Sequence, residues 1–233
     1  MATWFWVTVC TSTEASLWPQ DWQIMAILYD RAMILPGMDL PLGTIWCIGR
    51  NYSEHAKELG NAPPTSPIVF LKPTSSILLS GGTLFLPPDS KRVDHEVELV
   101  VARAKDESLL MAVGVDFTAR DIQERDKAKG LPWTSSKGRP GFSALGPFVP
   151  AKLPAEFSLT VNGQARQKGS STEMIFPVET ILAHLESVYG MGPGDIVYTG
   201  TPAGISPLAS GDRVEAVLGG GASRLSVTVT DRA

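Results

Sequence analysis

The chain has 233 residues, of which 43% are hydrophobic and 19% are charged, a composition that supports one substantial core and excludes intrinsic disorder. Glycine and proline make up about 17% of the residues, against roughly 12% on average, which indicates many short elements joined by tight turns rather than a helix bundle. The formal net charge of −4 provides no basic surface for a phosphate backbone, so we expect no nucleic-acid partner.

The chain begins with an aromatic, weakly patterned N-terminal extension, residues 1–42, to which we assign no chemistry. Its first 22 residues contain four of the six tryptophans but no lysine or arginine, which argues against a secretory signal. No apolar run approaches the ~20 residues of a membrane span, so we expect no membrane partner. Cys10 and Cys47 lie in no metal-binding spacing. We predict a cytoplasmic protein.

The rest of the chain, residues 43–233, contains no repeat, low-complexity tract or linker and is predicted to be one α+β, mainly β, domain. Short apolar runs bounded by turn residues predict strands at residues 45–48, 68–71, 96–101, 113–117, 157–161, 196–199, 214–217 and 225–229.

A short helix is predicted for residues 51–59, with Ser53 able to cap its start. His55 and Glu58 are three residues apart and share one face of this helix. The carboxylate could orient the imidazole while the other ring nitrogen acts on a water, although an ordinary surface pair has the same spacing. Turn residues around the helix indicate a lid.

The acidic segment at residues 94–99 is predicted to be a strand whose alternating side chains place Asp94, Glu96 and Glu98 on one face. Adjacent carboxylates repel one another unless water or a cation lies between them, and oxygen donors alone suit Mg²⁺ or Mn²⁺. A solvent-exposed strand face is the other interpretation of this pattern.

Asp116 lies in a second apolar strand, where a lone carboxylate is costly to bury without a partner. Two strands can bring Glu96, Glu98 and Asp116 to one point, leaving other positions of an octahedral ion for water and substrate. The three carboxylates therefore predict a metal site.

Two longer helices follow. Residues 119–129 are mostly charged, which predicts a helix that faces solvent or lines a cleft. Pro177 suits a first helical position, and the residues after it, up to Val188, form one apolar stripe, so a core-facing helix is expected there. His184 lies beside this stripe and is interpreted as a structural residue.

Together these segments resemble the fumarylacetoacetate hydrolase family, specifically its single-domain acylpyruvase-like branch. The resemblance runs from about Thr44 to the C-terminus. It is carried, in the family's order, by Ile48-Gly49-Arg50-Asn51-Tyr52 with His55 and Glu58, Phe70-Leu71-Lys72-Pro73, Asp94 to Leu99, Asp116 to Asp121 with Gln123, Gly130 to Trp133 with Lys137, and Gly200-Thr201-Pro202. The stretch 138–143 departs from the family pattern, which affects the expected pocket wall.

The resemblance implies a fold of layered mixed β-sheets with a few short helices, a homodimer, and a Mg²⁺ or Mn²⁺ site. By position, Glu96, Glu98 and Asp116 become the metal ligands, and the catalytic residues become His55, Glu58 and Lys137. Positions that match substrate-binding residues are Arg50, Asn51, Arg120, Gln123, Lys137 and Thr201.

The function that the resemblance implies is metal-dependent hydrolysis of the C–C bond in acylpyruvates, 2,4-dioxo acids such as fumarylpyruvate or acetylpyruvate, with enolpyruvate as the leaving group. Oxaloacetate decarboxylation or tautomerisation, or isomerisation of 2-hydroxyhepta-2,4-diene-1,7-dioate, needs the same site and is the alternative. A non-catalytic 2-oxo-acid binding protein is the second alternative. In each case the partner is a small 2-oxo acid.

Overall fold

The computed structural model describes residues 33–58, 60 and 62–231, so most of the predicted N-terminal extension lies outside the described residues. From Ile34 onward the chain forms one compact unit. Leu35 and Met38, which the sequence places in the extension, are buried against apolar residues of the large sheet that include Ile45 and Tyr198. Two of the last ten residues of the predicted extension therefore contribute to the core.

The large sheet has the order β2-β1-β13-β6-β7-β9-β3, with β10 paired to β7. It is mixed, because β1 pairs with β13, and β3 with β9, in parallel, whereas the other neighbours are antiparallel. Its strands are β1 (Ile45–Gly49), β2 (Ile68–Lys72), β3 (Ile77–Leu79), β6 (Val97–Arg103), β7 (Leu109–Asp116), β9 (Ser143–Leu145), β10 (Val149–Pro150) and β13 (Ile196–Tyr198).

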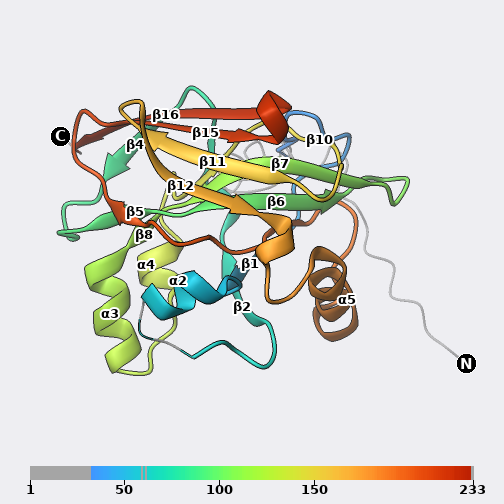
Figure 1. Cartoon of the computed structure of the whole chain (residues 1–233), viewed down its shortest axis with the longest axis horizontal. Helices are drawn as coiled ribbons and strands as arrows, with labels where there is room; N and C mark the ends of the chain where they lie inside the picture. Colours follow the sequence, from blue (N-terminus) through green and yellow to red (C-terminus); the bar gives the residue numbers. More distant parts are fainter. Residues whose placement is uncertain (1–32, 59, 61, 232–233) are drawn as a thin grey trace, which may run out of the picture. The chain divides into compact units, whose positions relative to one another are not determined.

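The second sheet lies over the large one and has the order β12-β11-β15-β16-β4 (Figure 1). Buried and more exposed residues alternate along β11, β15 and β16, as expected for strands with one face on the core. Apolar residues from both sheets form the main core. The strands of this second sheet are β4 (Thr83–Leu86), β11 (Glu156–Val161), β12 (Gln164–Ser170), β15 (Arg213–Leu218) and β16 (Ser223–Asp231).

A third, small sheet breaks the strand predicted for residues 94–99. Residues Val93–His95 form β5, which pairs with β8 (Thr118–Ala119) and β14 (Ser206–Pro207), whereas β6 begins at Val97 in the large sheet. Glu96 therefore lies where the chain passes from one sheet to the other, and its carbonyl accepts a hydrogen bond from the Asp116 amide. The prediction of one continuous strand was wrong here, because the residues before Glu96 pair with strands of the small sheet and the residues after it pair with strands of the large sheet.

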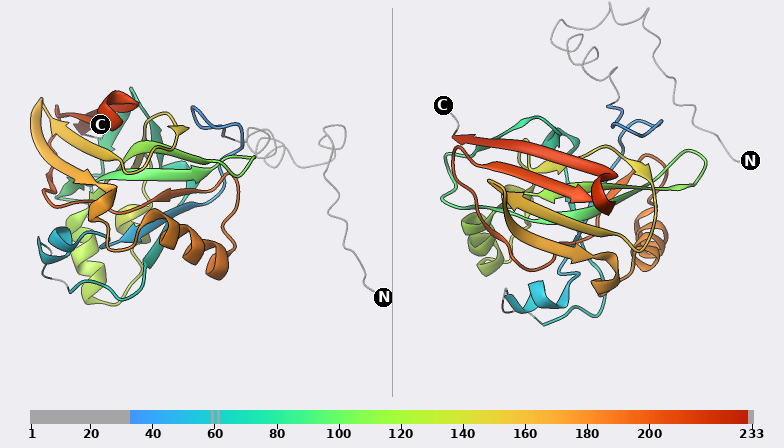
Figure 2. Two further views of the ribbon diagram at one scale, coloured as in Figure 1. Left: turned by 45° about the vertical axis from the view of Figure 1, so that its right-hand side comes forward. Right: turned by 45° about the horizontal axis from the view of Figure 1, so that its top comes forward.

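Helices α2, α3 and α4 cluster on one side of the sheets, and α5 lies apart from them (Figures 1 and 2). Both predicted longer helices are present, but Pro177 is the residue before the first helical turn of α5 rather than its first residue. In the described chain, no helix is long and apolar enough to cross a membrane. The helices are α2 (Ser53–Glu58), α3 (Arg120–Ala128), α4 (Thr134–Lys137) and α5 (Val178–Tyr189), with 3₁₀ turns at Thr74–Ser76, Ser171–Glu173 and Gly219–Gly221.

Candidate active site

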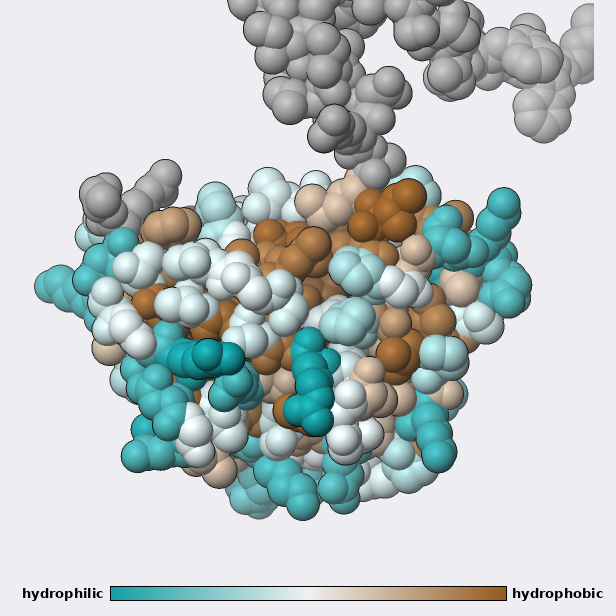
Figure 3. Space-filling model, turned by 90° about the horizontal axis from the view of Figure 1, so that it is seen from above, coloured by the Kyte–Doolittle hydropathy of each residue, from teal (hydrophilic) through white to brown (hydrophobic). Residues whose placement is uncertain are grey.

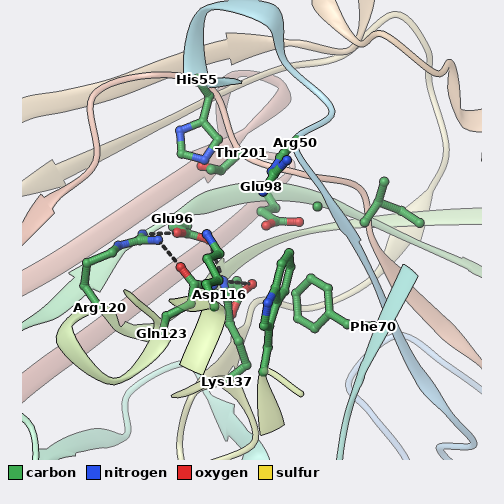
Figure 4. Close-up of a pocket in the computed structure, with 14 residues that line it drawn as sticks. Arg50, His55, Phe70, Glu96, Glu98, Asp116, Arg120, Gln123, Lys137 and Thr201 are labelled. Atoms are coloured by element: carbon green, nitrogen blue, oxygen red, sulfur yellow. Dashed lines mark hydrogen bonds and ion pairs between the residues drawn. The ribbon is translucent and has the colours of Figure 1, made fainter. Parts of the chain in front are cut away.

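One pocket, with about 390 Å³ of empty space, gathers most of the residues singled out in the sequence (Figure 4). They come from the ends of β1, β6 and β7, from α2, α3 and α4, and from the segment after β13. The predicted site residues that line it are Arg50, His55, Glu96, Glu98, Asp116, Arg120, Gln123, Lys137 and Thr201.

Three buried carboxylates converge in this pocket. One oxygen from each of Glu96, Glu98 and Asp116 lies within 4.8 Å of the others. In the register of β6 and β7, Glu98 faces Gly114, and this pairing places Glu96 and Asp116 at the same end of the two strands. The arrangement brings together the residues that the sequence assigned to a metal site.

Glu98 is the least compensated of the three. Its carboxylate accepts a hydrogen bond of 2.7 Å from the Gly200 amide, and no cation contacts it within the described part of the chain. Burial, together with the negative charges of Asp116 and Glu96, raises the pKa of Glu98 well above its usual value. A buried oxygen-only donor set, one carboxylate of which has no cation in contact among the described residues, fits a hard divalent cation such as Mg²⁺ or Mn²⁺.

Two lysines neutralise the other carboxylates. Lys137 Nζ donates to Glu96 Oε2 at 2.7 Å and to Asp116 Oδ2 at 2.6 Å. Lys72 Nζ donates at 2.5 Å to Asp116 Oδ1 and at 2.5 Å to the Phe142 carbonyl. Both lysines are almost completely buried. Burial alone would lower the pKa of Lys137, but Asp116 and Glu96 raise it to about 12, so its ammonium stays charged.

Arg120, at the start of α3, connects the small sheet to the pocket. Its guanidinium donates to Asp94 Oδ2 at 2.9 Å, to Gln123 Oε1 at 2.6 Å, and to Glu96. Burial would raise the pKa of Glu96, but the cations of Lys137 and Arg120 hold it below its usual range. Asp94, predicted on the same face as Glu96, therefore acts on the site through Arg120. The predicted cleft-lining character of this helix agrees with its buried residues, which include Arg120 and Gln123.

His55 projects from α2 into the pocket and lies close to Thr201 (Figure 4). Its Nδ1 is 3.1 Å from Glu58 Oε2, and the other oxygen of Glu58 accepts a hydrogen bond of 3.1 Å from the Gly204 amide. Among the described residues, Nε2 of His55 has no hydrogen-bond partner. The structure thus contains the predicted pair, oriented so that one ring nitrogen is available in the pocket.

Two predicted site residues do not line the pocket. Glu58 acts on it through His55. Asn51 is fully buried, and its amide bonds only backbone groups, those of Phe176 and Thr199. These bonds tie the segment before α2 to the end of β13 and to the segment before α5. Asn51 thus supports the segment that carries Thr201 and does not reach the pocket.

The sequence did not single out several residues of the site. Lys72 and Trp133 belong to motifs that carried the resemblance, yet no role was assigned to them. A lysine at the end of an apolar strand is a signal for a buried partner, and Lys72 has one in Asp116. Lys127 and Phe70 also line the pocket. In the atypical stretch 138–143, no residue lines the pocket.

The family model described as fumarylacetoacetate (FAA) hydrolase C-terminal matches residues 44–230, more than half of the chain. The chain belongs to the FAA hydrolase family. This membership confirms the resemblance and the predicted fold of mixed sheets with few short helices.

The names of similar proteins state different reactions. The mitochondrial oxaloacetate tautomerase FAHD1 of Arabidopsis thaliana is 42% identical over 192 residues, 76% of this chain and 86% of that protein. The mitochondrial oxaloacetate decarboxylase of Dictyostelium discoideum is 40% identical over 188 residues, 73% of this chain and 86% of that protein. The fumarylpyruvate hydrolase of Pseudomonas aeruginosa, solved with Mn²⁺ and pyruvate, is 31% identical, with a TM-score of 0.78 over 87% of this chain and 97% of that one.

Proposed function

We propose that this protein acts on 2-oxo acids and hydrolyses the C–C bond of acylpyruvates, 2,4-dioxo acids such as fumarylpyruvate and acetylpyruvate. The observation that carries the proposal is the His55–Glu58 pair in the same pocket as the three converging carboxylates. Glu96, Glu98 and Asp116 are the residues that would hold Mg²⁺ or Mn²⁺. Such an ion, when bound, supplies the positive charge that stabilises an oxyanion at the 2-oxo position.

The protein residues supply binding and proton transfer. Glu58 holds His55 through Nδ1, so Nε2 can take a proton from the attacking water and return it to the carbon that leaves. Water adds to the distal carbonyl, the C–C bond breaks, and the products are a carboxylic acid and pyruvate formed through its enol. Arg120 and Lys137 each keep a donor beyond their protein contacts and neutralise the substrate carboxylate.

A second candidate is tautomerisation or decarboxylation of oxaloacetate. It is favoured by relatives about 40% identical to this chain whose names state these activities. Both reactions build negative charge on the 2-oxo oxygen, as hydrolysis does, but neither consumes water. Decarboxylation also needs no base to activate water, so it depends least on His55.

In the test, the protein with Mg²⁺ is given fumarylpyruvate, acetylpyruvate or oxaloacetate in parallel. Absorbance follows the loss of the substrate, released acid reports hydrolysis, and CO₂ reports decarboxylation. We expect acylpyruvate hydrolysis that a chelator abolishes, and a loss of about 100-fold or more in His55→Asn. His184→Asn, on α5 and outside the pocket, is the matched control and should retain activity. Turnover of oxaloacetate alone would replace the hydrolase by the second candidate, and binding without any turnover would leave a 2-oxo-acid binding protein.

A further inference from the structure

An apolar groove lies next to the candidate active site and shares two aromatic residues with it. Phe70 of β2 and Trp133, the residue before α4, line both the pocket and the groove. They thus form an aromatic wall between the two spaces. The groove contains about 1030 Å³ of empty space. Its other lining residues include Trp46, Ile68, Leu71, Leu131, Pro132 and Tyr189.

The aromatic wall is packed closely against its neighbours. The centres of its two rings are 5.3 Å apart, and the rings meet edge to face. Gly49, the last residue of β1, makes room for Trp133, because a Cβ at this position would lie 3.2 Å from Cζ3 of the indole. Lys127 Nζ is 5.1 Å from the centre of the Trp133 ring, and Lys137 Nζ is 5.3 Å from that of Phe70. Both lysines line the pocket and neither lines the groove, so their charges lie on the pocket side of the wall.

The groove differs from the pocket in its chemistry. Among the described residues, none that lines the groove carries a charge, whereas carboxylates and cations line most of the pocket. Leu71 and Leu131 of the groove are 51% and 49% exposed, although both are large apolar residues. Covering such a surface with an apolar group is favourable, because it removes the surface from water. The groove therefore suits an uncharged chain or ring.

The groove lies at the end of the site where the acyl group of an acylpyruvate is expected. Figure 4 shows Arg120 and Gln123 on one side of the three carboxylates and Phe70 on the other. The proposed function places the carboxylate of the substrate against Arg120. In a 2,4-dioxo acid the acyl group and the carboxylate are at opposite ends of the molecule. We therefore expect the acyl group to extend toward Phe70 and the groove behind it.

We propose that the groove is an acyl subsite, and that the preferred substrates are acylpyruvates with an apolar acyl group longer than acetyl. The inference rests on the proposed function, which supplies the position of the 2-oxo acid end. The methyl group of acetylpyruvate is too short to leave the pocket, and the distal carboxylate of fumarylpyruvate is charged. We expect both to be turned over less efficiently than a longer apolar acylpyruvate. Phe70 and Trp133 determine this specificity, because the acyl chain passes along their rings.

The experiment measures the binding of unreactive 2-oxo acids of increasing chain length. Pyruvate, 2-oxopentanoate and 2-oxooctanoate keep the carboxylate and the 2-oxo group but lack the 4-oxo group that hydrolysis requires. Calorimetry in saturating Mg²⁺ gives the affinity of each. Every CH₂ group that reaches the groove should tighten binding by about 3- to 4-fold. We expect 2-oxooctanoate to bind about 30-fold or more tightly than pyruvate.

Matched leucine variants test whether the chain lies in the groove. Leu131→Ser and Leu71→Ser change exposed side chains that line the groove but not the pocket. Each should reduce the ratio of the 2-oxooctanoate affinity to the pyruvate affinity by about 5-fold or more. Leu79→Ser changes a leucine that is 40% exposed and lines neither space, so it should keep the wild-type ratio.

Equal wild-type affinity for pyruvate and 2-oxooctanoate would overturn the acyl subsite and leave the groove to a protein partner. A ratio that Leu79→Ser lowers as much as Leu131→Ser does would also overturn it. A gain in affinity with chain length, without hydrolysis of any acylpyruvate, would keep the subsite and overturn the proposed hydrolase. Hydrolysis of acetylpyruvate without that gain would do the reverse.

Discussion

At the scale of single residues, Glu98 is the carboxylate of the site that no cation contacts among the described residues. Glu98 is buried beside two further carboxylates. It accepts a hydrogen bond from the amide of Gly200, which comes 102 residues later in the chain. Its raised pKa means that the folded, metal-free protein binds a proton there more tightly than the unfolded chain does. The contribution of this group to stability is present at acid pH and is lost as the pH rises from about 4.3 through the folded-state pKa.

Replacing Glu98 by Gln should therefore stabilise the metal-free protein at pH 7.5 and remove its response to Mg²⁺. We expect a rise in Tm of about 2–4 °C without metal, corresponding to about 1 kcal/mol, and no further rise when Mg²⁺ is added. Scanning calorimetry with and without Mg²⁺ measures both effects, with the exposed Glu179→Gln as the control. A Glu98→Gln protein that Mg²⁺ stabilises as much as wild type would remove Glu98 from the metal site.

At the scale of elements, Gln167 of β12 joins the second sheet to the segment that carries Thr201. Its carbonyl accepts from the Val97 amide at 3.0 Å and lies 2.9 Å from His95 Nδ1. Its amide donates to Thr201 Oγ1 and to the Pro202 carbonyl, both at 2.9 Å. One buried side chain thus holds the pocket residue Thr201 against both sheets.

Gln167→Leu should cost about 2–4 kcal/mol of folding stability, because it leaves several buried polar groups without partners. Denaturant unfolding measures the loss. Gln167→Glu sets a buried carboxylate oxygen against the Pro202 carbonyl and should not recover the stability that Gln167→Leu loses. A loss below about 0.5 kcal/mol for Gln167→Leu would show that these bonds do not hold the two sheets together.

The apolar pattern decided which strands the sequence could predict: β13, with three apolar residues, was found, and the polar β12, with seven residues, was not. Strands β6, β7, β11 and β16 have five or more residues with a clear apolar pattern, and they were found at nearly the right positions. Strands β5, β8 and β14 have two or three residues, too few to show a period, and exist only because they pair with one another. The passage between sheets at Glu96 is likewise a consequence of distant pairing.

At the scale of the molecule, the sheet sandwich leaves apolar surface on the side viewed in Figure 3, where brown residues gather across the middle of the face. Leu79 of β3 and Phe85 of β4 are 40% and 54% exposed. Such patches are typical of protein interfaces. The homodimer expected from the resemblance, like the cytoplasmic location, stays a prediction.

If the exposed apolar surface at Phe85 forms the interface, light scattering on a sizing column should give a mass of about 50 kDa, twice the 25.0 kDa of one chain. Phe85→Asp should shift the mass toward that of the single chain, whereas the exposed Val188→Asp on α5 should not. A dimer that survives Phe85→Asp would place the contact elsewhere, and a wild-type mass of 25 kDa would end the prediction.

The residues of the candidate site could be predicted from the sequence more fully than the fold that brings them together. Residue type pointed to Glu96, Glu98 and Asp116, because acidic residues in apolar segments need a reason to be there, although the strand alternation predicted across residues 94–99 does not hold at Glu96. The role of Lys72 depends on Asp116, its partner 44 residues further along the chain. This contact arises only when β2 and β7 come together in the large sheet.

The most direct test is a crystal structure of the protein with Mn²⁺ and oxalate, using anomalous scattering to locate the ion. One ion should be bound by one oxygen from each of Glu96, Glu98 and Asp116 at about 2.1–2.2 Å, with oxalate beside it and His55 facing the same space. An ion located elsewhere, or a pocket in which these three carboxylates bind no Mn²⁺, would contradict the account.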